Sequence, residues 1–308
     1  MEFFMTNRIA QASHTTDHEH SGLEADLAQL RILNRRRALG ILGLASTTAM
    51  LAACGGGSAQ GSTGGAIGSA TPTPTPTPTP TSTGTAPGGT SNCVAYATET
   101  NGPYPADGTN QSSGPISNVI TQSDFQRSDI RTSVDGAGEA EGIELTFTIT
   151  LVDVNNDCAA LEGYAIYIWH CDADGRYSLY DLPNEDFLRG IQTTDANGQV
   201  TFTTIVPGTY YGRYPHIHFE VFTSIGNATT GRYAQLISQF AVPKDVLNTI
   251  YAQDSTYASS VNALNAATLS GDNVFGDNSS EQLTAMMVTM SGSVADGYTA
   301  SATVGIAT

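Results

Sequence analysis

The sequence is poor in several residue types, and each shortage narrows the range of possible functions. Twelve lysine and arginine residues stand against 29 aspartate and glutamate residues, giving a formal net charge of −17. This charge repels the phosphate backbone of nucleic acids, so we expect no nucleic-acid partner. The chain has only four cysteines and no Cys-x-x-Cys pair, which argues against a zinc site built from thiolates. It also carries no flavin or nicotinamide fingerprint.

The first 53 residues resemble an export signal. Arg35-Arg36-Arg37 precede a run of small and apolar residues from Gly40 to Ala53, which is too short and too rich in alanine and glycine for a membrane span. The run ends in Leu51-Ala52-Ala53-Cys54, which resembles a lipobox; the alternative is a chance match in an ordinary signal. We therefore expect residues 1–53 to be a twin-arginine lipoprotein signal peptide. The exported protein would be held by a lipid at Cys54 on a membrane surface facing the periplasm or the cell exterior.

The rest of the chain divides into a linker and one domain. Residues 54–91 are rich in glycine, serine, threonine and proline, with five Thr-Pro repeats between Thr71 and Pro80, a composition typical of a disordered stalk. Residues 92–308 suffice for one domain. An exported domain can keep a disulfide, but Cys93, Cys158 and Cys171 leave one thiol over, and the sequence does not identify the pair.

Strand patterns dominate this domain. Residues 142–154 alternate apolar and polar side chains with the period of two that is typical of a half-buried strand. Further strands are predicted over residues 164–171, 200–206, 216–223 and 233–242, and an edge strand over 299–307. Two helices are predicted over 244–252 and 281–290. Short strands separated by turn residues favour an all-β fold, an antiparallel β-sandwich with short helices.

His216-Ile217-His218 is the first candidate metal-binding motif. Only three histidines lie beyond the signal, and these are two of them; the third is His170. On a strand, residues i and i+2 point to the same face, so the two imidazoles can converge on one metal ion while Ile217 faces the core. Alone, the motif is equally typical of two histidines that are satisfied in the core or exposed to solvent.

Two further ligands are needed, and the residues nearby offer two kinds. Glu220 shares the face of the histidines and could complete a two-histidine, one-carboxylate ferrous site. The segment is also rich in tyrosine, and phenolate oxygen suits Fe(III) because a bound cation lowers the pKa of its ligand. The alternative for any one tyrosine is packing, which strands favour. The tyrosines are Tyr177, Tyr180, Tyr210, Tyr211 and Tyr214.

Several ordered motifs around these residues match one family. Residues 169–178 (WHCDADGRYS), 187–190 (FLRG), 194–198 (TDANG), 204–210 (TIVPGTY) and 212–219 (GRYPHIHF) closely resemble successive motifs of the intradiol ring-cleavage dioxygenases. Upstream, residues 102–104 (GPY) and 127–130 (RSDI) resemble the extracellular branch of that family, which is similar to the protocatechuate dioxygenase β-subunit. The resemblance covers roughly residues 93–308.

Position by position, the resemblance implies a non-heme Fe(III) site. Its ligands would be Tyr177, Tyr210, His216 and His218, with Tyr210 as the axial tyrosinate that leaves when substrate binds. Arg213 stands where the family has an arginine that stabilises negative charge on the substrate, the alternative being a surface salt bridge. His170, Tyr211 and Tyr214 are expected to be structural or to line the pocket.

The implied reaction uses O2 and a catechol-type substrate. The catechol would lose both protons, to Tyr210 and a hydroxide, and its ring would open between the two hydroxylated carbons to give a muconate-type diacid. Two other hypotheses remain: an exported β-sandwich binding module without catalysis, and the ferrous oxygenase that uses Glu220. The sequence leaves open which catechol is cleaved and the oligomeric state, for which a monomer is credible.

Overall fold

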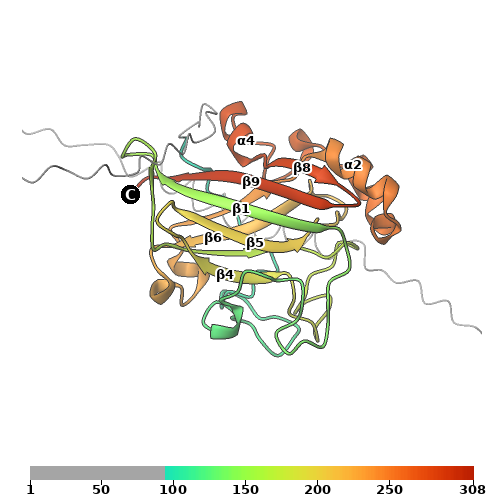
Figure 1. Ribbon diagram of the computed structural model, residues 1–308, viewed down its shortest axis with the longest axis horizontal. Helices are drawn as coiled ribbons and strands as arrows, with labels where there is room; N and C mark the ends of the chain where they lie inside the picture. The colour runs from blue at the N-terminus through green and yellow to red at the C-terminus, as the bar shows by residue number, and fades with distance from the viewer. Residues whose placement is uncertain (1–93) are drawn as a thin grey trace, which may run out of the picture. The chain divides into compact units, whose positions relative to one another are not determined.

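The computed structural model describes residues 94–308, which form two β-sheets flanked by short helices (Figure 1). The predicted signal peptide and linker, including Cys54, lie outside the described residues. The first sheet has the order β2-β1-β9-β8, with β5 pairing on the other side of β1, and the second has the order β4-β3-β6-β7. The fold is the expected all-β sandwich.

Each predicted strand is present, within a few residues of its expected bounds. The predicted segments correspond to β1 (Glu144–Asp153), β3 (Ala165–Trp169), β5 (Gln199–Ile205), β6 (His216–Phe222), β7 (Leu236–Ala241) and β9 (Gly297–Ile306). The strands not predicted are β2 (Ala159–Ala160), β4 (Arg189–Thr193) and β8 (Thr289–Ser293). β2 has only two residues and β8 is mostly polar, so neither strand shows a clear apolar alternation.

The C-terminal strand differs from the prediction in its position and its direction. β9 lies between β1 and β8 rather than at an edge, and it runs parallel to β1 over nine residue pairs from Leu145↔Tyr298 to Asp153↔Ile306. The first sheet is therefore mixed rather than purely antiparallel. Alternation identifies a strand but does not identify its neighbour, because pairing depends on contacts distant in sequence.

The helices follow β7. α2 (Lys244–Gln253), η5 (Ser255–Ser260) and α3 (Val261–Ala266) come first, then η6 (Leu269–Gly271) and α4 (Ser280–Met286). The helix predicted over 281–290 is thus only half right, because α4 ends at Met286 and β8 begins at Thr289. Three further 3-10 turns are η2 (Ser123–Phe125), η3 (Ile225–Asn227) and η4 (Gly231–Tyr233). Among the described residues, no helix is long and apolar enough to cross a bilayer.

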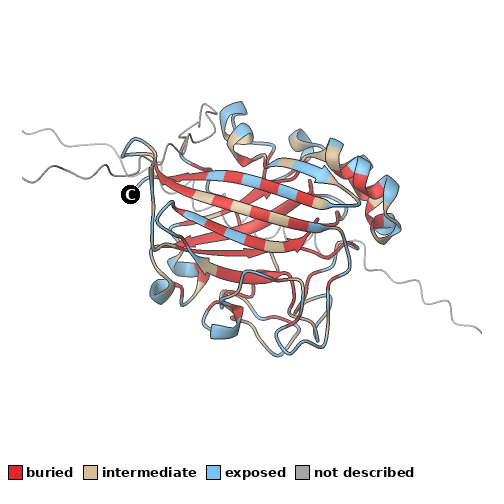
Figure 2. Ribbon diagram, in the orientation of Figure 1, coloured by how far each residue is buried: buried red, intermediate tan, exposed pale blue. Residues whose placement is uncertain are grey.

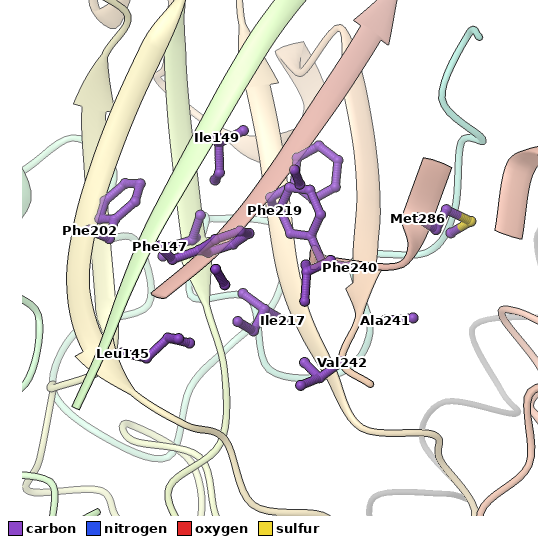
Figure 3. Packing of buried hydrophobic residues seen from close by; sticks show 14 of the residues in the cluster. Leu145, Phe147, Ile149, Phe202, Ile217, Phe219, Phe240, Ala241, Val242 and Met286 are labelled. Atoms are coloured by element: carbon purple, nitrogen blue, oxygen red, sulfur yellow. The ribbon is translucent and has the colours of Figure 1, made fainter. Parts of the chain in front are cut away.

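The main core lies between the two sheets (Figure 3). Phe147 of β1 meets Phe240 of β7 edge to face with ring centroids 5.0 Å apart, and Phe219 of β6 stacks on Phe240 at 4.2 Å. β1 and β9 alternate buried and more exposed residues, whereas β3 and β6 are buried along their whole length (Figure 2). The second sheet is therefore covered on both faces, so a site on its outer face is buried.

The cysteines now have distinct states. Cys158 is disulfide-bonded, and its partner lies outside the described residues. Cys171 is a buried free thiol whose Sγ contacts the carbonyl oxygen of Gly208 at 3.6 Å. The leftover thiol expected from the sequence is therefore Cys171.

Candidate metal centre

The two histidines of β6 lie side by side on the outer face of the second sheet. Their Nε2 atoms are 3.0 Å apart, and both residues are buried. Ile217 between them points into the main core. The His-x-His motif therefore has the geometry expected of a strand, with the imidazoles on one face and the apolar residue on the other.

Tyr177 and Tyr210 reach the same point from two loops. Tyr177 lies in the β3–β4 loop, and its Oη is 3.1 Å from Nε2 of His218 and 3.4 Å from Nε2 of His216. Tyr210 lies in the β5–β6 loop, and its Oη is 3.3 Å from Nε2 of His216 and 3.4 Å from Oη of Tyr177. We call these four atoms and their residues the donor cluster.

The spacing of the donor cluster fits a metal ion. Five separations among its four atoms lie between 3.0 and 3.4 Å. A point equidistant from four atoms so spaced lies about 2 Å from each, which is the length of a bond from a metal ion to a histidine nitrogen or a protein oxygen. Two phenolic oxygens and two imidazole nitrogens form a hard donor set with room for one cation, so these residues fit the iron that the resemblance implies.

The histidines are held in the neutral form that a metal requires. Burial, together with the positive charge of Arg213, lowers the pKa of His216 to about 3. Burial also lowers the pKa of His218 well below its ordinary value. Nδ1 of His216 lies 2.6 Å from the carbonyl oxygen of Tyr214, to which it donates its proton, leaving the Nε2 lone pair directed at the cluster. The ring of His218 stacks on Trp169, 4.8 Å away and 8° from parallel.

A carboxylate turn positions Tyr177. Oδ1 of Asp172 accepts the backbone N–H groups of Asp174 at 3.0 Å and Arg176 at 2.8 Å, while Oδ2 pairs with the Arg176 guanidinium. Gly175 takes a φ of +84° inside this turn, a conformation that glycine adopts without strain. The backbone N–H of Tyr177 then donates to Asp181 at 2.8 Å.

The helical segment after β7 fixes the loop that carries Tyr210. Tyr251 of α2 donates to the carbonyl oxygen of Pro207 at 2.7 Å, and Tyr257 of η5 donates to that of Val206 at 2.9 Å. Ser260 bridges the two ligand-bearing loops, because its Oγ accepts from the N–H of Thr209 and donates to the carbonyl oxygen of Ala173. Both tyrosines of the donor cluster are therefore positioned by one hydrogen-bonded framework.

Arg213 lies beside the donor cluster and is buried, contrary to the alternative of a surface salt bridge. Its Nη1 is 3.5 Å from Nε2 of His216, its Nη2 donates to Oε1 of Gln239 at 2.5 Å, and its Nε donates to Oδ2 of Asp272 at 3.0 Å. Burial alone would raise the pKa of Asp272, but Arg213 and the N–H of Tyr214 outweigh it and the pKa falls below its ordinary value.

Glu220 is not part of the cluster. It is fully buried, and its carboxyl lies against the carboxyl of Asp107. Burial and the neighbouring Asp107 carboxyl raise its pKa well above the ordinary value. No group of three or more histidine, cysteine, aspartate or glutamate side chains in residues 94–308 could hold a metal ion. The two-histidine, one-carboxylate arrangement is therefore not formed, and a metal here needs the tyrosines.

The remaining sequence candidates are structural in their contacts. His170 is buried, with Nδ1 2.8 Å from the carbonyl oxygen of Cys171 and Nε2 2.7 Å from Oγ1 of Thr204. Tyr211 is 42% exposed, and Tyr214 packs edge to face on Phe275. Tyr180 donates to Oδ1 of Asn110 at 2.7 Å, away from the cluster.

Gln239 and Asp272 were not predicted from the sequence. Gln239 stands in an otherwise apolar strand, LISQFA, and a polar residue at a buried strand position is a usable signal. Asp272 lies 59 residues beyond Arg213 in a loop, so no spacing rule connects them.

Comparisons with known proteins show the family and the fold. A family model described as Dioxygenase matches residues 112–266, half of the chain. The structure of an intradiol ring-cleavage dioxygenase from Tetranychus urticae is 25% identical, with a TM-score of 0.50, and the match covers 70% of this chain and 95% of that one.

Two bacterial structures are more distant. The dioxygenase domain of a dioxygenase–carbohydrate-binding protein fusion from Streptomyces sp. SirexAA-E is 20% identical, with a TM-score of 0.42 and coverage of 70% and 99%. The 3-chlorocatechol 1,2-dioxygenase from Rhodococcus opacus 1CP is 19% identical, with a TM-score of 0.40 and coverage of 68% and 71%. A search among curated proteins found no significant match. On the family-model match and the shared fold, the chain belongs to the intradiol ring-cleavage dioxygenase family.

Proposed function

We propose that this protein is an exported non-heme Fe(III) dioxygenase that cleaves a catechol-type ring between its two hydroxylated carbons with O2. The observation that carries the proposal is the convergence of the donor atoms of Tyr177, Tyr210, His216 and His218, of whose six separations five are between 3.0 and 3.4 Å. Bound Fe(III) would supply Lewis acidity and a template for the two substrate oxygens. The product would be a muconate-type diacid.

Tyr210 is the ligand best suited to give way to substrate. Of the four cluster residues it is the one that is partly exposed, whereas Tyr177, His216 and His218 are at most 3% exposed. Its phenolic oxygen would be the base that takes and holds a proton from a catechol hydroxyl. Tyr177 and the two histidines, fixed by packing, would keep their positions during this exchange.

Arg213 is placed to stabilise negative charge on the bound substrate. Its guanidinium is 2% exposed, lies next to His216 and is held in one orientation by Gln239 and Asp272. A donor that is fixed before the reaction and shielded from water stabilises developing charge without having to reorganise. We propose that Arg213 would donate an N–H to an anionic oxygen of the bound substrate.

Oxygen uptake tests the activity most simply. The iron-loaded protein should consume O2 when catechol is added and form one molecule of product for each O2 consumed. This product should absorb in the ultraviolet as a muconate does. Arg213→Lys should keep the charge but lose the planar fork, lowering kcat by roughly 10²-fold, as removal of a single stabilising donor does. Absence of uptake across uncharged and carboxylated catechols, with iron bound, would refute the proposed reaction.

A further inference from the structure

Arg213 is the cation nearest the donor cluster, and an anion already neutralises it. Oδ2 of Asp272 accepts from its Nε at 3.0 Å, and the two side chains are 1% and 0% exposed. Opposite charges so close and so buried largely cancel for a third group. A ligand in the site therefore meets the N–H groups of Arg213 with a positive charge that Asp272 reduces.

Asp272 is fixed independently of Arg213. Its Oδ1 accepts the backbone N–H groups of Val274 at 2.8 Å and Phe275 at 3.1 Å, and its Oδ2 also accepts that of Tyr214 at 2.5 Å. Hydrogen bonds from several N–H groups favour a carboxylate in its charged form. The negative charge is thus built into the loop after η6 and does not depend on a mobile side chain.

The other cations of residues 94–308 are exposed or held by other groups, and of them the buried Arg189 also acts electrostatically on His218. Seven lysine and arginine residues lie in this range, and Arg213 is the one that hydrogen-bonds an atom of the donor cluster. Of the remaining six, Arg131 and Arg176 pair with carboxylates. Arg127, Arg189 and Lys244 donate to backbone and side-chain oxygens, and Arg232 lies on the surface. The charge of −17 adds a long-range repulsion of anions.

We propose that Asp272 sets the charge specificity of the site, which accepts catechols without a ring carboxylate and rejects carboxylated ones. A substrate carboxylate would have to be desolvated beside a cation whose partner is already in place, and burial of an unpaired charge is costly. This inference rests on the proposed function, since it specifies which catechols that function uses.

Two ligands of similar shape isolate the effect of the ligand's charge on binding. 4-Methylcatechol and 3,4-dihydroxybenzoate carry a methyl or a carboxylate at the same ring position, and anaerobic calorimetry on the iron-loaded full chain gives their dissociation constants without turnover. The proposal predicts that the carboxylate binds at least about 10-fold more weakly. Equal or tighter binding of the carboxylate would overturn this inference alone. Failure of both ligands to bind would overturn the proposed function, and this inference with it.

Two variants then shift the charge in opposite directions. Asp272→Asn removes the anion beside Arg213, so binding of 3,4-dihydroxybenzoate relative to 4-methylcatechol should rise roughly 10-fold. Gln239→Glu adds an anion on the other arm of Arg213, so the same ratio should fall. Gln239→Glu decides the question alone if Asp272→Asn does not fold. A purely structural role for Asp272 would weaken both ligands equally, and an unchanged ratio in Gln239→Glu would likewise count against the proposal.

Discussion

At the scale of single residues, the site depends on which atoms carry protons. His216 and His218 are neutral because burial disfavours the imidazolium, and the Nδ1 proton of His216 is committed to the carbonyl oxygen of Tyr214. The Nε2 atom of His216 is consequently free of a proton and directed at the donor cluster. The same physical cause acts on His170, which is not a cluster residue and so reports on burial without the complication of a metal.

We predict that His170 makes the fold sensitive to mild acid. Burial lowers its pKa to about 4, against 6.5 for the exposed side chain. Between these values the unfolded chain binds the proton and the folded chain does not, so the free energy of unfolding falls as the pH decreases. The loss between pH 7 and pH 5 should be about 2 kcal/mol for this one group.

Urea unfolding of the iron-free protein at the two pH values measures this loss. His170→Gln, which cannot titrate in this range, should lose about 2 kcal/mol less than the wild type does. An identical pH dependence in the two proteins would show that folding leaves the pKa of His170 unchanged.

At the scale of elements, the site is assembled where two loops cross. Gly208 in the β5–β6 loop passes so close to the β3–β4 loop that a Cβ on it would lie 2.5 Å from the carbonyl oxygens of both Asp172 and Ala173. Tyr210 follows two residues later, and Tyr177 lies in the opposing loop. The close approach of two backbones therefore sets the distance between the two tyrosine ligands.

Gly208→Ala should accordingly disturb the metal site. The added methyl must push the two loops apart, because backbone carbonyls cannot rotate out of its way, and Tyr210 should move from the cluster. We predict at least a 10-fold loss of iron affinity, the scale seen when a supporting contact of a metal ligand is lost. Gly226→Ala is the control, since its Cβ would meet only Oγ of Ser224, at 3.9 Å. Equal iron binding by the two variants would contradict this account of the loop crossing.

The elements differ in how far the sequence could predict them. Local patterns in the sequence predict β1, β6 and α2. These patterns are the alternation of apolar and polar residues, the proline and glycine residues that bound the elements, and the opposite faces of Ile217 and the histidines. The parallel pairing of β9 with β1 and the contact of Asp272 with Arg213 join segments that are distant in sequence. Such contacts depend on the complete packing arrangement, and no local periodicity encodes them.

The donor cluster could be predicted from the sequence only in part. Geometry made His216 and His218 candidates, while Tyr177 and Tyr210 were chosen among five tyrosines by resemblance to a family. The structure brings those four together and leaves Glu220 against Asp107. The distinguishing cause is the loop framework, including Asp172 and Ser260, which places two of the five tyrosines at the histidines.

At the scale of the whole molecule, we propose that a lipid holds this acidic domain at a membrane surface. The twin arginines, the lipobox-like Ala53-Cys54 and the Thr-Pro stalk support export of a domain that has already folded. The full-length protein should fractionate with membranes, while Cys54→Ser should appear in the soluble extracytoplasmic fraction. Arg35→Lys with Arg36→Lys should retain it in the cytoplasm. Membrane association of Cys54→Ser equal to that of the wild type would argue against the lipid anchor.

The central claim is that two tyrosinates and two histidines hold one ferric ion, and the visible spectrum of the purified protein, taken beside an iron assay, tests it most directly. The account predicts one iron per chain and a red to burgundy charge-transfer band, which Tyr177→Phe should remove or shift strongly. The exposed-site control Tyr211→Phe should leave it unchanged. A colourless protein that retains iron, or a band that Tyr177→Phe does not alter, would contradict the account.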